Sequence, residues 1–162
     1  MTKTSKEIEK YFKVTDKKIC GFFKEYRFLS NFQTCNIQFN GFTYSSTEAA
    51  FQAAKSLDPK DHERFQFLSA AESKKEGRIL NLREDWGKVK DDIMLALTFE
   101  KFKDPELAEK LLATGDLILE ETNHWHDIYW GVDYETNQGL NMLGKCLMVV
   151  RGVLRGRLEQ QG

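Results

Sequence analysis

The stretch from Asn36 to Lys55 reads NIQFNGFTYSSTEAAFQAAK, and the spacing of its apolar residues changes midway from that of strands to that of a helix. Apolar side chains flank Asn40-Gly41, a strong signal for a β-hairpin, because both central positions of the tight turn need a positive φ. From Ser46 onward the apolar residues recur at helical spacing, which predicts a helix over residues 46–57. A hairpin that leads directly into a helix indicates an α+β fold.

The rest of the chain is predicted to be mostly helical. Asp58-Pro59 and Asp104-Pro105 are typical helix starts, and Ser69-x-x-Glu72 fits a capping box. A loop over 122–140 is long enough to suggest a functional role. Further helices are expected over 5–13, 59–68, 70–80, 87–102, 105–113 and 141–157, and strands over 18–23 and 117–121. The sequence therefore predicts a helix-rich single α+β domain with a small antiparallel sheet.

Composition excludes several classes of protein. The chain has 162 residues with 24 basic and 25 acidic side chains, so its net charge of −1 gives no support for tight non-specific binding to nucleic acid. No segment has the roughly 18 apolar residues of a membrane span, and no secretory signal is visible. Cys20, Cys35 and Cys146 include no CxxC pair, so we expect reduced thiols and a cytoplasmic location.

One face of the predicted helix over 46–57 carries polar groups. At roughly 100° per residue, Glu48, Gln52 and Lys55 fall within about 60° of one another. A carboxylate, an amide and an ammonium group on one face, bordered by alanines, can form a binding or catalytic site. The alternative is structural: Ser45-x-x-Glu48 fits a capping box, and Lys55 can be a solvated lysine near the helix end.

The loop segment from Asn123 to Gly131 reads NHWHDIYWG and concentrates aromatic side chains around Asp127. Aromatic faces stack on nucleobases, and a carboxylate beside them can act in proton transfer. Trp130 can equally be a core residue. Two histidines, at 124 and 126, are too few for a zinc site, so we expect no metal.

Taken together, the motifs of the chain resemble those of the NADAR (YbiA-like) family. The resemblance runs in family order over almost the whole chain, and it predicts an N-terminal extension over 1–17 and the family domain over 18–160. The matching motifs are Phe22-Phe23, Ser30-Asn31-Phe32, Tyr44-x-x-Thr47-Glu48 with Gln52 and Lys55, Trp86, Met94, Lys101-Phe102, Leu111-x-x-Thr114-Gly115-Asp116, Glu120, Asp127-x-x-Trp130-Gly131, Gly139-x-Asn141-x-Leu143-Gly144 and Leu147-Met148-x-x-Arg151.

The resemblance implies an N-glycosidase without a cofactor that acts on an amine attached to C1 of a phosphorylated ribose. Two substrate classes are associated with the family: ADP-ribose on the amino group of guanine in DNA or RNA, and phosphoribosylamino-pyrimidines of riboflavin synthesis. Carried over by motif, the expected catalytic residues are Glu48, Lys55 and Asp127. The expected substrate-binding residues are Asn31, Gln52, Trp86, Trp130, Gly131, Asn141 and Arg151.

Cleavage of a C1–N bond needs an acid for the leaving nitrogen and a carboxylate that stabilises the developing cation or activates water. We expect Glu48, near a helix N-terminus, to be the ionised base or stabiliser, and Asp127 to act as the acid or to bind ribose hydroxyls. Lys55 offers a second route through a Schiff base. Trp86 and Trp130 are expected to stack on the substrate, and Arg151 is either a phosphate contact or a structural arginine.

Two other functions compete with an enzyme. A module that binds ADP-ribose without cleaving it has no need of the two carboxylates and the lysine. A purely structural protein leaves the polar helix face and the tryptophan-rich loop unexplained. The enzyme hypothesis depends on one expectation, that the helix bearing Glu48 and the loop bearing Trp130 line a common pocket.

Overall fold

A computed structural model describes residues 10–161 of the chain, which divides into two compact units. Residues 10–30 and 105–161 belong to the first unit, and Asn31–Asp104 forms the second. The helix expected over 5–13 lies partly outside the described residues. Its described end forms a turn that leads into a strand.

The first unit is built around a three-stranded sheet. Its strands are β1 (Lys13–Val14), β2 (Lys18–Cys20) and β5 (Ile118–Glu120), in the order β1-β2-β5. The β1–β2 pair is antiparallel, whereas β2 and β5 are parallel with Ile19 opposite Leu119. A parallel pair requires a long connection between its strands, and here that connection contains the entire second unit.

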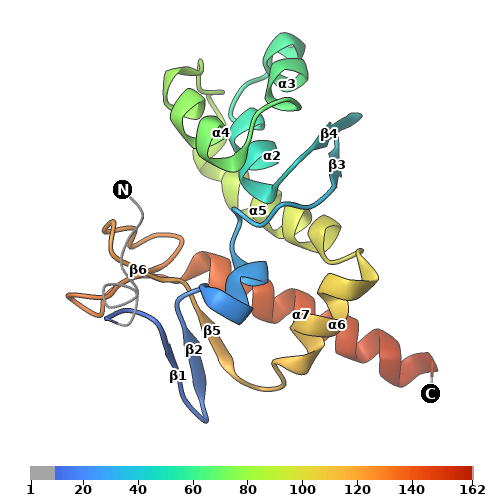
Figure 1. Ribbon diagram of the computed structural model, residues 1–162. Coiled ribbons are helices and arrows are strands. Elements are labelled where there is room, and N and C mark those ends of the chain that lie inside the picture. Colours follow the sequence, from blue (N-terminus) through green and yellow to red (C-terminus); the bar gives the residue numbers. More distant parts are fainter. Residues whose placement is uncertain (1–9, 162) are drawn as a thin grey trace. The chain divides into compact units, whose positions relative to one another are not determined.

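Helices complete the first unit. The α7 helix (Met142–Gln161) packs against β5 and against α6 (Pro105–Ala113), and a 3₁₀ helix, η1, spans Lys24–Leu29 (Figure 1). Leu143, Leu147 and Val150 of α7 are buried, but Val149 and Val153 are 49% and 36% exposed. The apolar stripe of α7 is therefore narrower than its sequence suggests.

The predicted loop over 122–140 contains two short strands, β6 (Thr122–Asn123) and β7 (Val132–Asp133). They pair in parallel, with Asn123 opposite Asp133. This pairing joins the two ends of the aromatic segment and closes it into a compact loop.

The second unit begins with the predicted hairpin. Its strands are β3 (Ile37–Phe39) and β4 (Phe42–Tyr44), and Asn40 and Gly41 have φ values of 51° and 85°. Both values lie in the left-handed region that this turn requires. The hairpin prediction is therefore confirmed.

The α2 helix (Thr47–Ala53) is central to the second unit. It packs against α3 (Pro59–Phe65), α4 (Ala70–Glu76), α5 (Trp86–Lys101) and the hairpin (Figure 1). Its Ala49, Ala50 and Ala53 side chains are fully buried, and such small residues allow close approach of neighbouring elements. A 3₁₀ helix, η2 (Gly77–Ile79), follows α4.

The helix starts in the second unit follow the sequence more closely than the helix ends. Asp58 accepts a hydrogen bond from the Lys60 backbone, and the Ser69–Glu72 capping box is present. By contrast, α2 ends at Ala53 rather than at residue 57, because the chain turns there. No helix within residues 10–161 combines the length and apolar content that crossing a bilayer needs.

Candidate active site

The cap of α2 leaves the Glu48 side chain available for other contacts. Ser46, not Ser45, is the N-cap, and its hydroxyl accepts from the Ala49 backbone at 3.1 Å. Ser45 donates instead to the Leu68 carbonyl at 3.0 Å. The predicted capping box of Ser45 and Glu48 is therefore wrong, and a different contact orients the Glu48 carboxylate.

That contact comes from Gln52, one turn along α2. Gln52 Nε2 donates to Glu48 Oε1 at 2.8 Å, and both side chains are buried. Gln52 Oε1 lies against Gly77, where an added Cβ would stand 2.0 Å from it. It has no hydrogen-bond partner among the described residues. Gly77 thus allows Gln52 to fit against α4 and to fix the orientation of Glu48.

Lys55 stands at the end of the same polar face and is half-buried. Burial lowers the pKa of Lys55 below its ordinary 10.5; the Glu48 charge opposes this shift, while Arg78 and Lys74 add to it. One carboxylate and three cationic groups therefore interact electrostatically here. A lysine with a lowered pKa has a larger neutral, nucleophilic fraction at physiological pH.

Asn31 and Trp86 lie beside α2 in the second unit. The Asn31 carbonyl accepts from the Glu48 backbone at 3.0 Å, and its side-chain amide reaches Met94 Sδ at 3.6 Å. Trp86 packs its ring on Phe51 of α2, with centroids 5.0 Å apart. The second unit thus brings together Asn31, Glu48, Gln52, Lys55 and Trp86.

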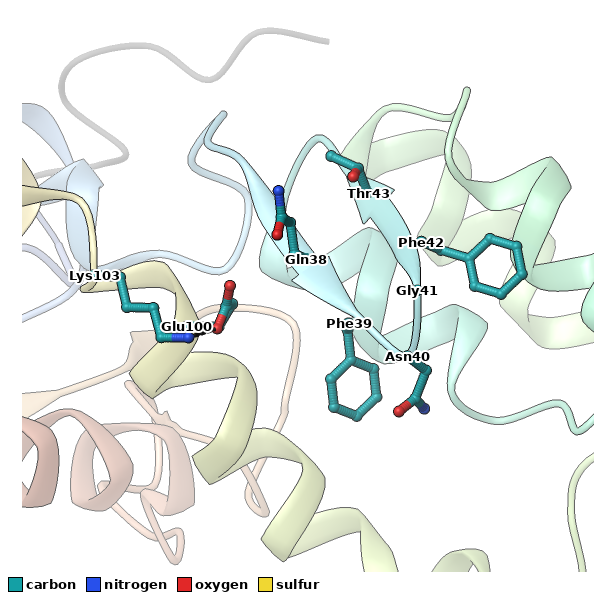
Figure 2. Close-up of a pocket in the computed structure, with 8 residues that line it drawn as sticks. All are labelled: Gln38, Phe39, Asn40, Gly41, Phe42, Thr43, Glu100 and Lys103. Carbon is teal, nitrogen blue, oxygen red and sulfur yellow. Dashed lines mark ion pairs between the residues drawn. The ribbon is translucent and has the colours of Figure 1, made fainter.

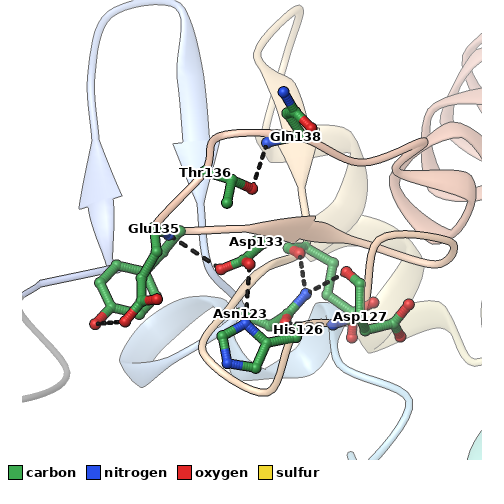
Figure 3. Close-up of polar contacts among 9 residues, drawn as sticks. Asn123, His126, Asp127, Asp133, Glu135, Thr136 and Gln138 are labelled. Carbon is green, nitrogen blue, oxygen red and sulfur yellow. Dashed lines mark hydrogen bonds and ion pairs between the residues drawn. The ribbon is translucent and has the colours of Figure 1, made fainter.

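The other predicted residues lie in the first unit, where Asp127 organises the aromatic loop and lies next to Asn123 (Figure 3). Asp127 Oδ1 accepts from the backbones of Tyr129 and Trp130 at 3.0 and 2.9 Å. Asn123, which is fully buried, accepts from the Asp127 N–H at 3.0 Å and donates to the Asp127 carbonyl at 2.8 Å. Asn123 was not among the predicted residues, although its i, i+4 spacing to Asp127 was a possible signal.

Gly131 and Asn141 both lie against backbone groups at the start of this loop. A Cβ on Gly131 would stand 2.2 Å from the Glu121 carbonyl oxygen. The Asn141 amide donates to the Leu119 carbonyl at 2.9 Å and accepts from the Glu121 backbone at 3.0 Å. Both polar ends of Asn141 are thus hydrogen-bonded to the chain at β5. They hold the loop in place, and a contact of either residue with substrate stays a prediction.

Arg151 lies on α7 and is buried, with Nη1 donating to Thr114 Oγ1 at 2.8 Å. Burial lowers the pKa of this guanidinium. The contact connects α7 to the end of α6. This geometry favours the structural alternative that the sequence left open for Arg151.

One group of potential metal ligands converges within the described residues: His126, Asp133 and Glu135, with ligand atoms within 4.8 Å of one another. His126 Nδ1 contacts Asp133 Oδ2 at 2.9 Å, and Asp133 Oδ1 accepts from the Glu135 backbone at 3.0 Å (Figure 3). The three residues lie close together because these hydrogen bonds hold the loop closed.

A pocket of about 460 Å³ opens in the second unit beside the β3–β4 turn. The hairpin forms one side, and Glu100 and Lys103 lie on the other (Figure 2), joined by an ion pair of 2.6 Å. None of the predicted site residues lines this pocket. The pocket is therefore separate from the predicted site residues of the second unit.

Comparison with known proteins agrees with the motifs around these residues. The sequence profile of the NADAR domain matches residues 11–155. The chain belongs to the NADAR domain family. The matched range includes residues of both compact units.

Named relatives of this NADAR domain are enzymes. It is 35% identical over 144 residues to an N-glycosidase of Nostoc punctiforme, covering 85% of the chain and 91% of that protein. To the N-glycosidase YbiA of Escherichia coli it is 36% identical over 131 residues, covering 78% and 81%. The chain is accordingly an enzyme of the N-glycosidase class, which hydrolyses N-glycosyl bonds.

A solved structure confirms the fold. The NMR structure of E. coli YbiA superposes with a TM-score of 0.77 at 33% identity, covering 91% of this chain and 90% of that one. This establishes the α+β fold. A riboflavin biosynthesis protein of Vibrio vulnificus is 36% identical over 134 residues, 79% of this chain but 35% of that protein's length.

Proposed function

We propose that this NADAR domain hydrolyses the C1–N bond between a phosphorylated ribose and an amino group, and that its substrate is ADP-ribose attached to guanine in DNA or RNA. The observation that carries the proposal is the buried Glu48–Gln52 pair with half-buried Lys55 on one face of α2. A module that only binds nucleotide has no need of a lysine with a lowered pKa beside an oriented carboxylate.

Phosphoribosylamino-pyrimidines are the second candidate substrate. The observation that favours them is the similarity to the Vibrio riboflavin biosynthesis protein. They share with the modified guanine an amine on C1 of a phosphorylated ribose, so the same residues can act on both. The near-neutral net charge of −1 favours small or single-stranded substrates over a long duplex.

In direct hydrolysis, Glu48 is the carboxylate that stabilises the positive charge on C1 or takes a proton from the attacking water. Gln52 holds one of its oxygens, which fixes the direction of the carboxylate before the reaction. Asp127 protonates the leaving nitrogen or binds ribose hydroxyls, and Trp86 and Trp130 stack on base or ribose.

In the lysine route, the substrate nitrogen expels the ring oxygen O4′, which takes up a proton, and C1 becomes an iminium carbon. Neutral Lys55 attacks C1, and the original amine leaves with a proton, so that a Schiff base joins Nζ and C1. Water then adds to C1, releasing the phosphorylated ribose and regenerating the lysine. The lowered pKa of Lys55 supports this route because the attacking amine must be neutral.

The test is release of ADP-ribose from guanine-modified single-stranded DNA by wild type, Glu48→Gln and Lys55→Ala. Lys75→Ala is the matched control, since Lys75 is an exposed lysine on α4. We expect the two site variants to lose activity and the control to keep it. Wild-type rates in both site variants, with folding verified, would remove the assignment. A side-by-side assay on a phosphoribosylamino-pyrimidine decides between the substrates.

Borohydride separates the two routes. It reduces a Schiff base to a stable amine, so the lysine route predicts a covalent ribose adduct on Lys55 that mass spectrometry locates. Lys55→Ala must not form that adduct. Turnover by wild type without any adduct would show that water attacks directly.

The proposal places the reaction in the cytoplasm. No disulfide joins the three cysteines, which all lie within the described residues, and Cys146 is buried. Reduced thiols agree with that compartment.

A further inference from the structure

The α4–η2 segment lies directly beside the polar face of α2 in the second unit. Gly77 packs against the Gln52 side chain, and the Arg83 N–H donates to the Lys55 carbonyl at 2.8 Å. Residues 77–83 therefore run alongside residues 52–55. Ser73, one helical turn before Gly77, is fully buried, which places this side of α4 toward the body of the unit.

Two cationic residues follow directly after these packed positions. Lys74 is half-buried, and its Nζ lies 5.7 Å from the centre of the Phe32 ring. Phe32 is the neighbour of Asn31, whose carbonyl is bonded to the Glu48 backbone. Lys74 therefore lies over the segment that contacts the start of α2. Arg78 follows Gly77 and is exposed.

The charges of this region favour an anion. Lys74 and Arg78 both act electrostatically on Lys55, and Glu48 is the carboxylate whose charge opposes their effect. The carboxylates of α4 serve other groups, since Glu72 closes the capping box with Ser69 and Glu76 pairs with Arg64 at 3.1 Å. Like charges repel, and a phosphate near −2 would offset that repulsion with charge-assisted hydrogen bonds.

We propose that Lys74 and Arg78 form a phosphate subsite beside Lys55, which makes the enzyme selective for N-glycosides whose ribose carries a phosphate. The proposal rests on the proposed function and adds two specificity-determining residues to it. Arg151, for which the sequence left open a phosphate contact or a structural role, is buried against Thr114, whereas Lys74 and Arg78 belong to the unit that holds Glu48 and Lys55.

The experiment compares two forms of one substrate. A guanine-containing oligonucleotide is ADP-ribosylated, and half of it is trimmed enzymatically to plain ribosyl-guanine, which keeps the C1–N bond but lacks phosphate. Lys74→Ala and Arg78→Ala should each raise KM about tenfold for the ADP-ribosyl form, with kcat changed less. Neither should change KM for the trimmed form. The conservative variants Lys74→Arg and Arg78→Lys should restore most of the affinity.

Lys75→Ala is the control, because Lys75 neighbours Lys74 on α4 but is exposed. An equal rise in KM for both substrates would show that the residues have a general structural role, and it would overturn the subsite. Unchanged KM in both variants, or an equal rise in Lys75→Ala, would overturn it as well.

Calorimetry with free ADP-ribose keeps this test separate from that of the activity. If wild type cleaves neither substrate but binds ADP-ribose, and Lys74→Ala and Arg78→Ala weaken this binding tenfold, the proposed activity fails and the subsite stands. If wild type is active and the variants bind ADP-ribose normally, the subsite fails alone.

Discussion

The polar face of α2 and the loop around Asp127 use their polar side chains differently. On α2, the side chains of Glu48 and Gln52 are hydrogen-bonded to each other, and positive charges on the neighbouring α4–η2 segment lower the pKa of Lys55. In the loop, Asn123 and Asp127 bond mainly to backbone groups within a few residues. Polar groups on a regular helix are positioned by the elements that pack around it, whereas polar groups in a loop first have to stabilise the backbone of that loop.

The largest effect should come from the two carboxylates, one in each region. Glu48→Gln and Asp127→Asn keep an acceptor oxygen but remove the negative charge. We expect kcat/KM to fall by about 10²–10⁴-fold in each, with little change in Tm. Glu63→Gln on α3 is the control, since Glu63 is exposed. Normal turnover by Asp127→Asn would reduce the loop to a structural element.

Two glycine substitutions should separate the regions by stability. Alanine at Gly131 meets the Glu121 carbonyl, a backbone atom, whereas alanine at Gly77 meets the movable end of Gln52. We expect Gly131→Ala to lower the unfolding free energy by about 3 kcal/mol and Gly77→Ala by about 1 kcal/mol, because a side chain can move away at a smaller cost than a backbone atom can. Gly77→Ala should nevertheless lower kcat, since it displaces Gln52 from Glu48.

Urea unfolding and steady-state kinetics measure these two effects. The control is Gly152→Ala, because nothing lies within 4 Å of a Cβ built there. It should be neutral or slightly stabilising in the helix. Equal losses from Gly77→Ala and Gly131→Ala would contradict the distinction between side-chain and backbone packing.

A smaller effect, confined to alkaline pH, is expected from Lys101 in the second unit. Burial lowers its pKa from 10.5 to about 8. The unfolded state therefore binds more protons than the folded state between these values, and the stability contributed by this group rises with pH across that window. Relative to Lys101→Met, wild type should gain about 2 kcal/mol in unfolding free energy between pH 7 and pH 10. A constant difference would show that Lys101 is not titrating.

The smallest effect belongs to His126 and Asp133 in the first unit. Their hydrogen bond raises the pKa of His126 above 6.5 and lowers that of Asp133 below 3.8. The His126 contribution is fully present below pH 6.5 and is lost as pH rises through its raised pKa. The Asp133 contribution is present above pH 3.8 and is lost as pH falls through its lowered pKa. The pair therefore stabilises the loop most between these values.

An NMR titration of the His126 ring checks this. Asp133→Asn should return the His126 pKa toward its ordinary value, and Glu135→Gln should change it less, since Asp133 is the main cause of the shift. An unchanged His126 pKa in Asp133→Asn would exclude the contact in solution.

Local signals in the sequence were sufficient for much of the fold. The Asn40-Gly41 turn, the Asp58 cap and the Ser69–Glu72 box each depend on residues within four positions of one another, and all three are confirmed. The family motifs likewise identified the NADAR domain. The Ser45–Glu48 box failed because Ser45 meets Leu68, a partner distant in sequence.

By itself, then, the sequence determined the hairpin, most of the helices, the family and the enzyme class, because turns, caps and motifs are short-range patterns. Only the tertiary structure decided the present contacts of the predicted polar residues: Asn141 with β5, Arg151 with Thr114, and Gln52 against Gly77. It also brought Lys74 and Arg78 close enough to Lys55 for their charges to lower its pKa. The physical reason is that hydrogen bonds and charges act through space, and packing brings together partners that no local spacing reveals.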